Sequence, residues 1–363
     1  MWGPARTAPP AIPRPERGTG LDHCDRKGHR TLETVSSTIG NLGEFGLIAR
    51  VTARFPATEN VLLGPGDDAA VVRAADGRVV ATTDLLVEGR HFRRDWSSAR
   101  DVGHKAAAQN LADIAAMGAY PTALLVGFAA PADLPTAWAD EFSVGLRDEC
   151  AAAGAAVVGG DVVSSDTLTI AITALGDLRG AAPVRRDGAR PGDLVAVTGN
   201  LGLAAAGLAL LHAGQAEGHP DCLTAHRRPA PPYPAGPEAA RLGATAMIDI
   251  SDGLLQDLGH IAAASGVGIA VRSADLHPPA GLVEAVETLI RGGNAVRSPL
   301  DYMLAGGEDH ALAATFPPRT SLPRQWTVIG TVVDGDGVTV DGAIPKLSGW
   351  DHFRRTPDNS DRS

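Results

Sequence analysis

The chain has 363 residues and a formal net charge of -10, a length that accommodates two domains of roughly 100–200 residues each. The acidic balance argues against general affinity for nucleic acid, because phosphate backbones are held by clustered Lys and Arg. The three cysteines have no metal-binding spacing, and no apolar run approaches the roughly 20 residues of a membrane span. We therefore expect a cytoplasmic protein with neither nucleic acid nor membrane as partner.

The N-terminal 40 residues are rich in Pro, Arg, Gly and charge and show no period of helix or strand. We expect a disordered extension over residues 1–40. From Glu44 to Phe55 the apolar residues recur at steps of three and four, which predicts a short amphipathic helix. The first domain is therefore expected over residues 41–182.

This first domain is predicted to combine strands and helices. Short apolar runs predict strands at 61–63, 69–72 and 79–83, with Asp76-Gly77 as a hairpin turn before the third. A helix capped by Asp101 or a preceding serine follows to Met117, then a strand at 124–128, a helix at 134–152 and a strand at 167–175. This order resembles a split α+β sandwich with helices on one sheet face. The other sheet face then needs a cover, and a second copy of the chain would supply it. This predicts a homodimer with a sheet interface.

The second domain is predicted over residues 183–355, with a tail at 356–363. Its boundary falls just before the polar, turn-rich segment 185–193. Buried strands are predicted at 194–198, at 246–250 and after Asp309, each beside a glycine-containing turn. This pattern favours an α/β domain with glycine-rich turns placed for ligands at strand ends.

Six aspartates stand beside Gly, Ser, Thr or an apolar run, at predicted strand ends or helix margins. They are Asp68, Asp84, Asp113, Asp161, Asp249 and Asp252. Each one alone has an ordinary interpretation as a turn, cap or surface residue, and Gly64-Pro65-Gly66-Asp67-Asp68 alone is typical of a solvated turn. Mg²⁺ is held by carboxylates together with substrate phosphates, so several acids on different elements predict a phosphate site with several Mg²⁺ ions.

The remaining candidates each have two interpretations. Ser251-Asp252-Gly253 at a helix start offers backbone N–H groups to phosphate, or is an ordinary N-cap. Gly199-Asn200-Leu201-Gly202 matches neither the P-loop nor the dinucleotide fingerprint, and a plain strand-to-helix turn explains it as well. Arg186 suits a phosphate but lies in a linker, His91 contacts a substrate or caps a turn, and Trp350 offers a ring face or a packing anchor.

These motifs, taken together, resemble the thiamine-monophosphate kinase family, within the superfamily of aminoimidazole ribonucleotide synthetase, selenophosphate synthetase and a hydrogenase-maturation protein. The resemblance runs from Gly43-Glu44-Phe45 to Trp350-Asp351-His352-Phe353. Its motifs are Gly64-Pro65-Gly66-Asp67-Asp68, Thr82-Thr83-Asp84, Asn110-Leu111-Ala112-Asp113 with Ala116-Met117-Gly118, Gly159-Gly160-Asp161, Asp249-Ile250-Ser251-Asp252-Gly253 and Gly306-Gly307-Glu308-Asp309.

The resemblance implies ATP-dependent phosphorylation of thiamine monophosphate to thiamine diphosphate by direct transfer, in a homodimer formed by the first domain. It implies Mg²⁺ ligands at Asp68, Thr82, Thr83, Asp84, Asp113, Asp161, Asp249 and Asp252. It implies ATP contacts at Gly160, Asp161, Arg186 and Ser251 and substrate contacts at His91, Glu308 and Trp350. No covalent or general-base catalytic residue is implied. The segment Ala225-His226-Arg227-Arg228-Pro229 is also similar to a family motif, without an assigned role.

Two alternatives remain beside this function. One is another ATP-using synthetase of the same superfamily, similar to aminoimidazole ribonucleotide synthetase. The other is a non-catalytic dimer that binds nucleotide or metal, against which the number of acids argues, because like charges held together need a compensating cation.

Overall fold

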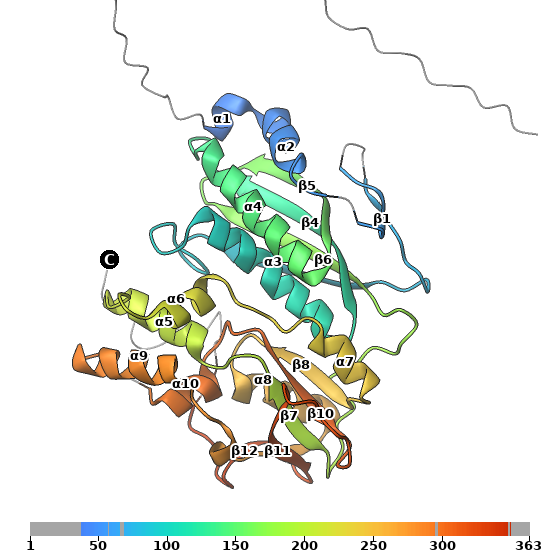
Figure 1. The fold of residues 1–363 in the computed structure, drawn as a ribbon, viewed down its shortest axis with the longest axis vertical. Coiled ribbons are helices and arrows are strands. Elements are labelled where there is room, and N and C mark those ends of the chain that lie inside the picture. The colour runs from blue at the N-terminus through green and yellow to red at the C-terminus, as the bar shows by residue number, and fades with distance from the viewer. Residues whose placement is uncertain (1–37, 57, 66–68, 295–296, 348, 350–363) are drawn as a thin grey trace, which may run out of the picture. The chain divides into compact units, whose positions relative to one another are not determined.

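A four-stranded and a six-stranded β-sheet with their covering helices, and a small two-stranded sheet, make up the part of the chain that the computed structural model describes (Figure 1). This part comprises residues 38–56, 58–65, 69–294, 297–347 and 349. The predicted N-terminal extension up to residue 37 lies outside these ranges, as do Asp68 and Trp350. The described residues belong to one unit by their contacts. No described helix is long and apolar enough to cross a membrane.

The first sheet has four strands in the order β3-β6-β4-β5. Their bounds are β3 Val80–Val87, β4 Tyr120–Ala130, β5 Ala156–Ser164 and β6 Thr169–Asp177. Strands β4 and β5 are parallel and the other pairs are antiparallel. Helices α3 (Ala99–Ala116) and α4 (Thr136–Ala153) cover one face of this sheet, as the sequence pattern predicts (Figure 1).

The two faces of the first sheet differ in burial. On the helix-covered face Leu124, Ile170 and Ile172 are at most 1% exposed. Alternate residues point to the other face, where Leu85 is 52%, Leu125 37% and Val163 50% exposed. We call this second side the outer face of the first sheet. At one end of this face Val61, Ala70 and Val72 pack on Ala123 and Ala156 and bury them, whereas Leu85, Leu125 and Val163 stay exposed.

Helix α3 begins as its sequence predicts. The Ser98 side chain accepts the N–H of Asp101, and the Asp101 carboxylate accepts the N–H of Ser98, so both predicted capping candidates take part in one capping box. Glycines let α3 approach α4 closely, because a Cβ at Gly103 would lie 2.2 Å from the Phe142 carbonyl oxygen and one at Gly145 would lie 2.1 Å from that of Arg100. The close approach buries most of α3.

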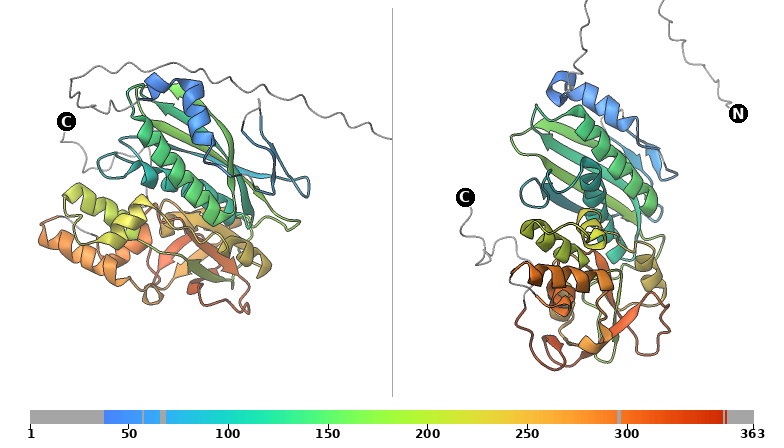
Figure 2. Two further views of the ribbon diagram at one scale, coloured as in Figure 1. Left: turned by 45° about the horizontal axis from the view of Figure 1, so that its top comes forward. Right: turned by 60° about the vertical axis from the view of Figure 1, so that its left-hand side comes forward.

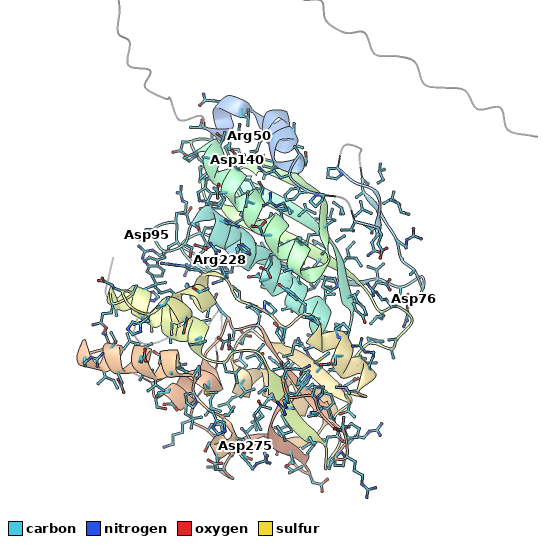
Figure 3. The ribbon with its side chains drawn as sticks, in the orientation of Figure 1. Arg50, Asp76, Asp95, Asp140, Arg228 and Asp275 are labelled. Atoms are coloured by element: carbon cyan, nitrogen blue, oxygen red, sulfur yellow. The ribbon has the colours of Figure 1, made fainter. Side chains whose placement is uncertain are left out.

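Smaller elements precede the first sheet. They are α1 (Ile39–Leu42), α2 (Glu44–Thr52) and the paired strands β1 (Val61–Leu63) and β2 (Val71–Val72). Arg50 of α2 pairs with Asp140 of α4, which fastens α2 to the helix layer (Figure 3). The predicted hairpin at Asp76-Gly77 is wrong, since β2 pairs with β1 whereas β3 pairs with β6.

The second sheet has six strands in the order β12-β9-β11-β7-β10-β8. Their bounds are β7 Leu194–Thr198, β8 Ala246–Ile250, β9 Gly268–Val271, β10 Ala311–Phe316, β11 Thr327–Val333 and β12 Gly337–Val340. Only the β9–β12 pair is parallel. The sheet is thus mainly antiparallel.

Side chains cover this second sheet on both faces. Val195, Val197 and Ile248 belong to a core with α5, α8 and α9, whereas Ala196 and Met247 pack with α7 and the end of α3. Helices α5, α6, α9 and α10 pack against one another (Figure 2). The helices are α5 Leu203–Ala213, α6 Pro220–Arg227, α7 Ala235–Arg241, α8 Leu254–Ser265, α9 Ala280–Arg291 and α10 Pro299–Ala305, with a 3-10 turn at Ser273–Asp275.

Candidate active site

The first part of the site lies where strand β3 faces helix α3. The Thr82 hydroxyl donates to Asp113 Oδ2 at 2.7 Å, and the backbone N–H of Asp84 donates to Asn110 Oδ1 at 2.9 Å. Asn110 is fully buried and donates its own amide N–H to the Ala106 carbonyl one turn back. The predicted neighbours Asn110 and Asp113 thus contact β3 differently: Asn110 accepts a backbone N–H of the strand, whereas Asp113 accepts the side-chain hydroxyl of Thr82.

The second part lies after strand β8. Asp249 is in the strand and only 3% exposed, and Asp252 follows in the turn that leads into α8. This turn is held by Asp257, whose Oδ2 accepts the backbone N–H groups of Asp252 and Gly253 at 3.1 and 3.0 Å. The sequence offers the backbone N–H groups of this turn as donors to phosphate. Those of Asp252 and Gly253 instead donate to the Asp257 carboxylate.

These two parts meet because α3 contacts β8. Burial, then the charges of Asp249 and Asp84, raises the pKa of Asp113 to about 7. Burial, then the charges of Asp249 and Asp252, likewise raises the pKa of Asp257 to about 7. Asp84, Asp113, Asp249, Asp252 and Asp257 therefore act on one another electrostatically, and we call these five residues the acidic group.

A loop of residues 306–310 closes on the acidic group. Its His310 Nδ1 lies 3.1 Å from Asp249 Oδ2 inside the protein, and the partnership with Asp249 raises the pKa of His310 although burial opposes this. The backbone N–H groups of Glu308 and His310 donate to the carbonyls of Ser251 and Ile250 at 2.7 and 2.8 Å. The loop is therefore fastened to the end of β8.

Asp309 of this loop occupies the start of helix α5. Its carboxylate accepts the backbone N–H groups of Gly202 and Ala204, and burial raises its pKa to about 7 despite these bonds. The Gly199-Asn200-Leu201-Gly202 segment is thus a strand-to-helix turn whose free N–H groups meet a carboxylate of the same chain. The plain interpretation of this segment is the one that the structure supports.

Two predicted ligands lie elsewhere on the first sheet. Across the strands Asp84 is in register with Ile172, Val126 and Gly160, whereas Asp161 is in register with Gly127, Ala171 and Leu85. The Asp161 side chain therefore points to the outer face, with Leu85, and away from Asp84. Thr83 also points to that face, where its hydroxyl accepts from Thr173 at 3.2 Å. Asp161 and Thr83 are not brought to the acidic group within this single chain.

Other predicted contacts are dispersed or fall outside the described residues. His91 Nδ1 accepts the N–H of Val87 at 3.0 Å, which is the turn-capping arrangement. Arg186 is exposed, and its carbonyl accepts the Ser265 hydroxyl at the far end of α8 from Asp252. Asp68 and Trp350 lie outside the described residues.

The structure adds charged residues that the sequence interpretation missed. Asp257 and His310 contact predicted acids, and Lys105 and His226 contact Glu308. A local signal existed for Asp257, which lies five residues after Asp252 at a helix start, and for His310, which follows the Gly306-Gly307-Glu308-Asp309 motif. Within the described residues no three His, Cys, Asp or Glu side chains converge closely enough to hold a metal ion as they stand.

Comparison with known proteins identifies the class of fold. The N-terminal domain model of AIR synthase related proteins matches residues 66–178, and the C-terminal domain model matches residues 190–342. The chain is therefore an AIR synthase related protein, and the two-domain mixed α/β fold predicted from its sequence is confirmed.

Individual relatives narrow this class. The thiamine-monophosphate kinase of Mycobacterium tuberculosis is 49% identical over 333 residues, which cover 91% of this chain and 97% of the relative. The crystal structure of that enzyme from Stenotrophomonas maltophilia has a TM-score of 0.71 at 34% identity, covering 82% of this chain and 96% of the other. AaThiL complexed with AMPPCP and TMP has a TM-score of 0.70 at 34% identity, covering 88% of this chain and all of the other. The chain belongs to the thiamine-monophosphate kinase family.

Proposed function

We propose that this protein transfers the γ-phosphoryl group of ATP to thiamine monophosphate and so forms thiamine diphosphate. The observation that carries the proposal is the acidic group, which gathers carboxylates from β3, α3, β8 and α8 next to the loop that bears Glu308. The family supports it, since relatives at up to 49% identity are thiamine-monophosphate kinases and one related structure holds AMPPCP and TMP.

We propose that Mg²⁺ binds at the acidic group. The donors there fit this ion, because they are carboxylates and the Thr82 hydroxyl, whereas the described cysteines, Cys150 and Cys222, are free and buried elsewhere. In the described part of the chain neither Asp113 nor Asp257 pairs with Lys or Arg. Bound cations would supply the positive charge that offsets these acids and the phosphates of ATP.

The proposed ligands and contacts keep the assignments made from the sequence. For Mg²⁺ they are Asp68, Thr82, Thr83, Asp84, Asp113, Asp161, Asp249 and Asp252. For ATP they are Gly160, Asp161, Arg186 and Ser251, and for the substrate His91, Glu308 and Trp350. Because Asp161 and Thr83 point away from the acidic group, their roles require ligand or partner groups on the outer face of the first sheet.

The chain's own residues orient the reactants rather than form a covalent intermediate. Asn110 and Asp257 fix the backbone of Asp84 and Asp252, and the 306–310 loop places Glu308 beside Ser251. A phosphate monoester is already ionised near neutral pH, so its attack on ATP needs positioning and not a general base. Rate enhancement then comes from alignment and charge compensation.

We propose that two copies of this chain associate through the outer face of the first sheet and that the protein acts in the cytoplasm. The exposed Leu85, Leu125 and Val163 support the dimer, because an apolar sheet face is stabilised by a second layer. Sedimentation at micromolar concentration should give a dimer, and Leu125→Arg should give a folded monomer. A monomeric wild-type protein would contradict this assembly.

The decisive test of the function is an assay of purified protein with ATP, MgCl₂ and thiamine monophosphate, read by chromatography of the thiamine phosphates. Thiamine diphosphate and ADP should appear in equal amounts, and unphosphorylated thiamine should not serve as acceptor. Release of ADP without thiamine diphosphate would favour the alternative of another synthetase of the superfamily. Binding of nucleotide without any turnover would favour the non-catalytic dimer.

A further inference from the structure

A second charged cluster lies beside the acidic group and involves three elements. Lys105 Nζ of α3 lies 3.0 Å from Glu308 Oε2, and His226 Nδ1 of α6 lies 3.2 Å from the same oxygen. Lys105 Nζ also donates to the carbonyl oxygen of His226 at 3.3 Å. We call these three residues the Glu308 cluster. It contains the histidine of the Ala225–Pro229 segment, to which the sequence assigns no role.

Burial within the Glu308 cluster is uneven. Lys105 and His226 are each 3% exposed, whereas the Glu308 side chain is 33% exposed. A lysine buried this deeply costs several kcal/mol unless it is paired, so its location requires the carboxylate. The basic groups thus lie behind the acid, and the acid alone reaches the surface of the site.

The backbone holds Glu308 independently of its side chain. Glu308 has φ +67° and His310 φ +51°, the left-handed region that non-glycine residues rarely adopt. The Glu308 N–H bond to Ser251 O maintains this conformation, and a Cβ at Gly307 would lie 2.7 Å from the same oxygen. Glu308 is therefore fixed at its backbone by the β8 turn and at its carboxylate by α3 and α6.

Only one oxygen of the carboxylate is used by these basic groups. Both contact Oε2, and in the described part of the chain Glu308 Oε1 accepts no hydrogen bond. Burial opposes the ionised form, but Lys105 and then His226 lower the pKa of Glu308 below its ordinary value. The arrangement keeps an ionised carboxylate in one orientation with an oxygen to spare.

We propose that Lys105 and His226 are positioning residues that hold Glu308 Oε2 so that Oε1 meets the cationic ring of the thiamine substrate. This inference rests on the proposed function and adds to it two residues that do not themselves touch substrate. It also assigns a role to the Ala225–Pro229 segment, because His226 contributes both its ring and the backbone carbonyl oxygen that accepts a hydrogen bond from Lys105 Nζ.

The test compares Lys105→Met, Glu308→Gln and the double variant by steady-state kinetics. Lys105→Met should raise the KM for thiamine monophosphate about tenfold and leave the KM for ATP within about twofold, because a charged hydrogen bond to the positioned carboxylate is lost. The double variant should be no worse than Glu308→Gln alone, because Lys105 acts only through Glu308. His226→Asn should show the same pattern with a smaller effect.

A matched control is available on the same two structural segments. Arg228, labelled in Figure 3, directly follows α6 and pairs with Asp101, one turn before Lys105 on α3, and it does not touch Glu308. Arg228→Gln should leave the KM for thiamine monophosphate within about twofold. An equal rise in this variant, or multiplicative effects in the double variant, would show that general docking of α6 on α3 is responsible and would overturn the proposal.

Two further measurements distinguish a failure of the positioning role from a folding defect and from a failure of the proposed function. If Lys105→Met alone does not fold, the comparison is made in the Glu308→Gln background, where no carboxylate is left unpaired. If the wild-type protein makes no thiamine diphosphate, the proposed function fails, and calorimetric titration with thiamine monophosphate still tests the cluster. Equal binding by wild type and Lys105→Met would then refute the positioning role.

Discussion

The acidic group and the Glu308 cluster share structural elements but differ in charge balance. Helix α3 supplies Asp113 to the acidic group and Lys105 to the Glu308 cluster. The 306–310 loop likewise supplies His310 to the acidic group and Glu308 to the cluster named after it. In the Glu308 cluster one carboxylate faces two basic side chains. In the acidic group the imidazole of His310 lies beside Asp249, and neither Asp113 nor Asp257 pairs with a Lys or Arg in the described part of the chain.

This difference separates two kinds of buried charge. In a cluster whose acidic and basic groups compensate each other, no ligand is needed to offset the charge, so the cluster serves to hold its side chains in one orientation. An unbalanced cluster raises the pKa of its own members, as it does for Asp113 and Asp257, and is stabilised by any cation that binds there. The comparison predicts that metal affects the acidic group strongly and the Glu308 cluster weakly.

The largest expected effect comes from removing one acid of the unbalanced cluster. Asp84→Asn should lower kcat by about a hundredfold or more, because a charged ligand of the proposed metal and phosphate site is lost. The fold should persist, since the backbone N–H of Asp84 still donates to Asn110. Turnover at varied MgCl₂ concentration and a circular dichroism spectrum check both statements.

The matched control for this variant is an acid outside the site. Asp148 of α4 pairs with Arg100 and Arg147 on the surface, so Asp148→Asn should leave turnover within about twofold. Near-wild-type activity of Asp84→Asn would remove Asp84 from the proposed metal site.

The loop that joins the two clusters gives the next largest effect. Gly307→Ala places a Cβ 2.7 Å from the Ser251 carbonyl oxygen, so the loop must shift. We expect a loss of about 1–3 kcal/mol in the free energy of unfolding and about a tenfold lower turnover, because Glu308 and His310 move together. Denaturant unfolding and the thiamine diphosphate assay measure the two effects.

Gly259→Ala is the control for the loop variant. Gly259 lies inside α8, and a Cβ there would meet nothing within 4 Å. This change should raise the free energy of unfolding by about 0.5–1 kcal/mol through helix propensity and leave turnover unchanged. A stable, fully active Gly307→Ala protein would show that the loop does not couple the two clusters.

The sequence predicts best what depends on neighbouring residues. Strands β7 and β8 have the predicted bounds, and the cap at Ser98 follows from local residue types. The same local order places Asp249 and Asp252 correctly at the end of a buried strand. Asp84 and Asp113 come together because the elements that carry them were recognised and packed as expected.

What the sequence does not predict depends on distant partners. Strand β5 was missed because Gly159-Gly160 has low strand propensity, and the fold needs Gly160 since a Cβ there would lie 2.0 Å from the Val126 carbonyl oxygen. The face of Asp161 depends on the register with β4, which shifts at a bulge near Leu125. Lys105 meets Glu308 203 residues away, and an alanine-rich helix gives no sign of this pairing.

A smaller effect is the pH dependence of stabilisation by metal. The folded-state pKa of Asp113 and Asp257 is about 7, above the ordinary value of 3.8, so the folded protein retains protons that the unfolded chain releases. Metal-free stability attributable to these groups therefore falls as the pH rises from about 4 to above about 7. Mg²⁺ binds the ionised forms, so the increase in Tm on adding MgCl₂ should be larger near pH 8 than near pH 6. An equal increase at both pH values would contradict the assignment of metal to the acidic group.

The smallest expected effect comes from Asp257, where two substitutions distinguish the contribution of its negative charge from that of its hydrogen bonds. Asp257→Asn keeps an oxygen that accepts the N–H groups of Asp252 and Gly253 while it removes a negative charge near Asp249. The metal-free protein should gain a few degrees in Tm, because repulsion is relieved, and kcat should stay within about threefold. Asp257→Ala, which removes the acceptor as well, should lose stability, since two N–H groups at the start of α8 are left without it. If Asp257→Asn is destabilised as much as Asp257→Ala, the carboxylate is held there by a compensating cation of the protein itself, and the acidic group is not unbalanced at α8.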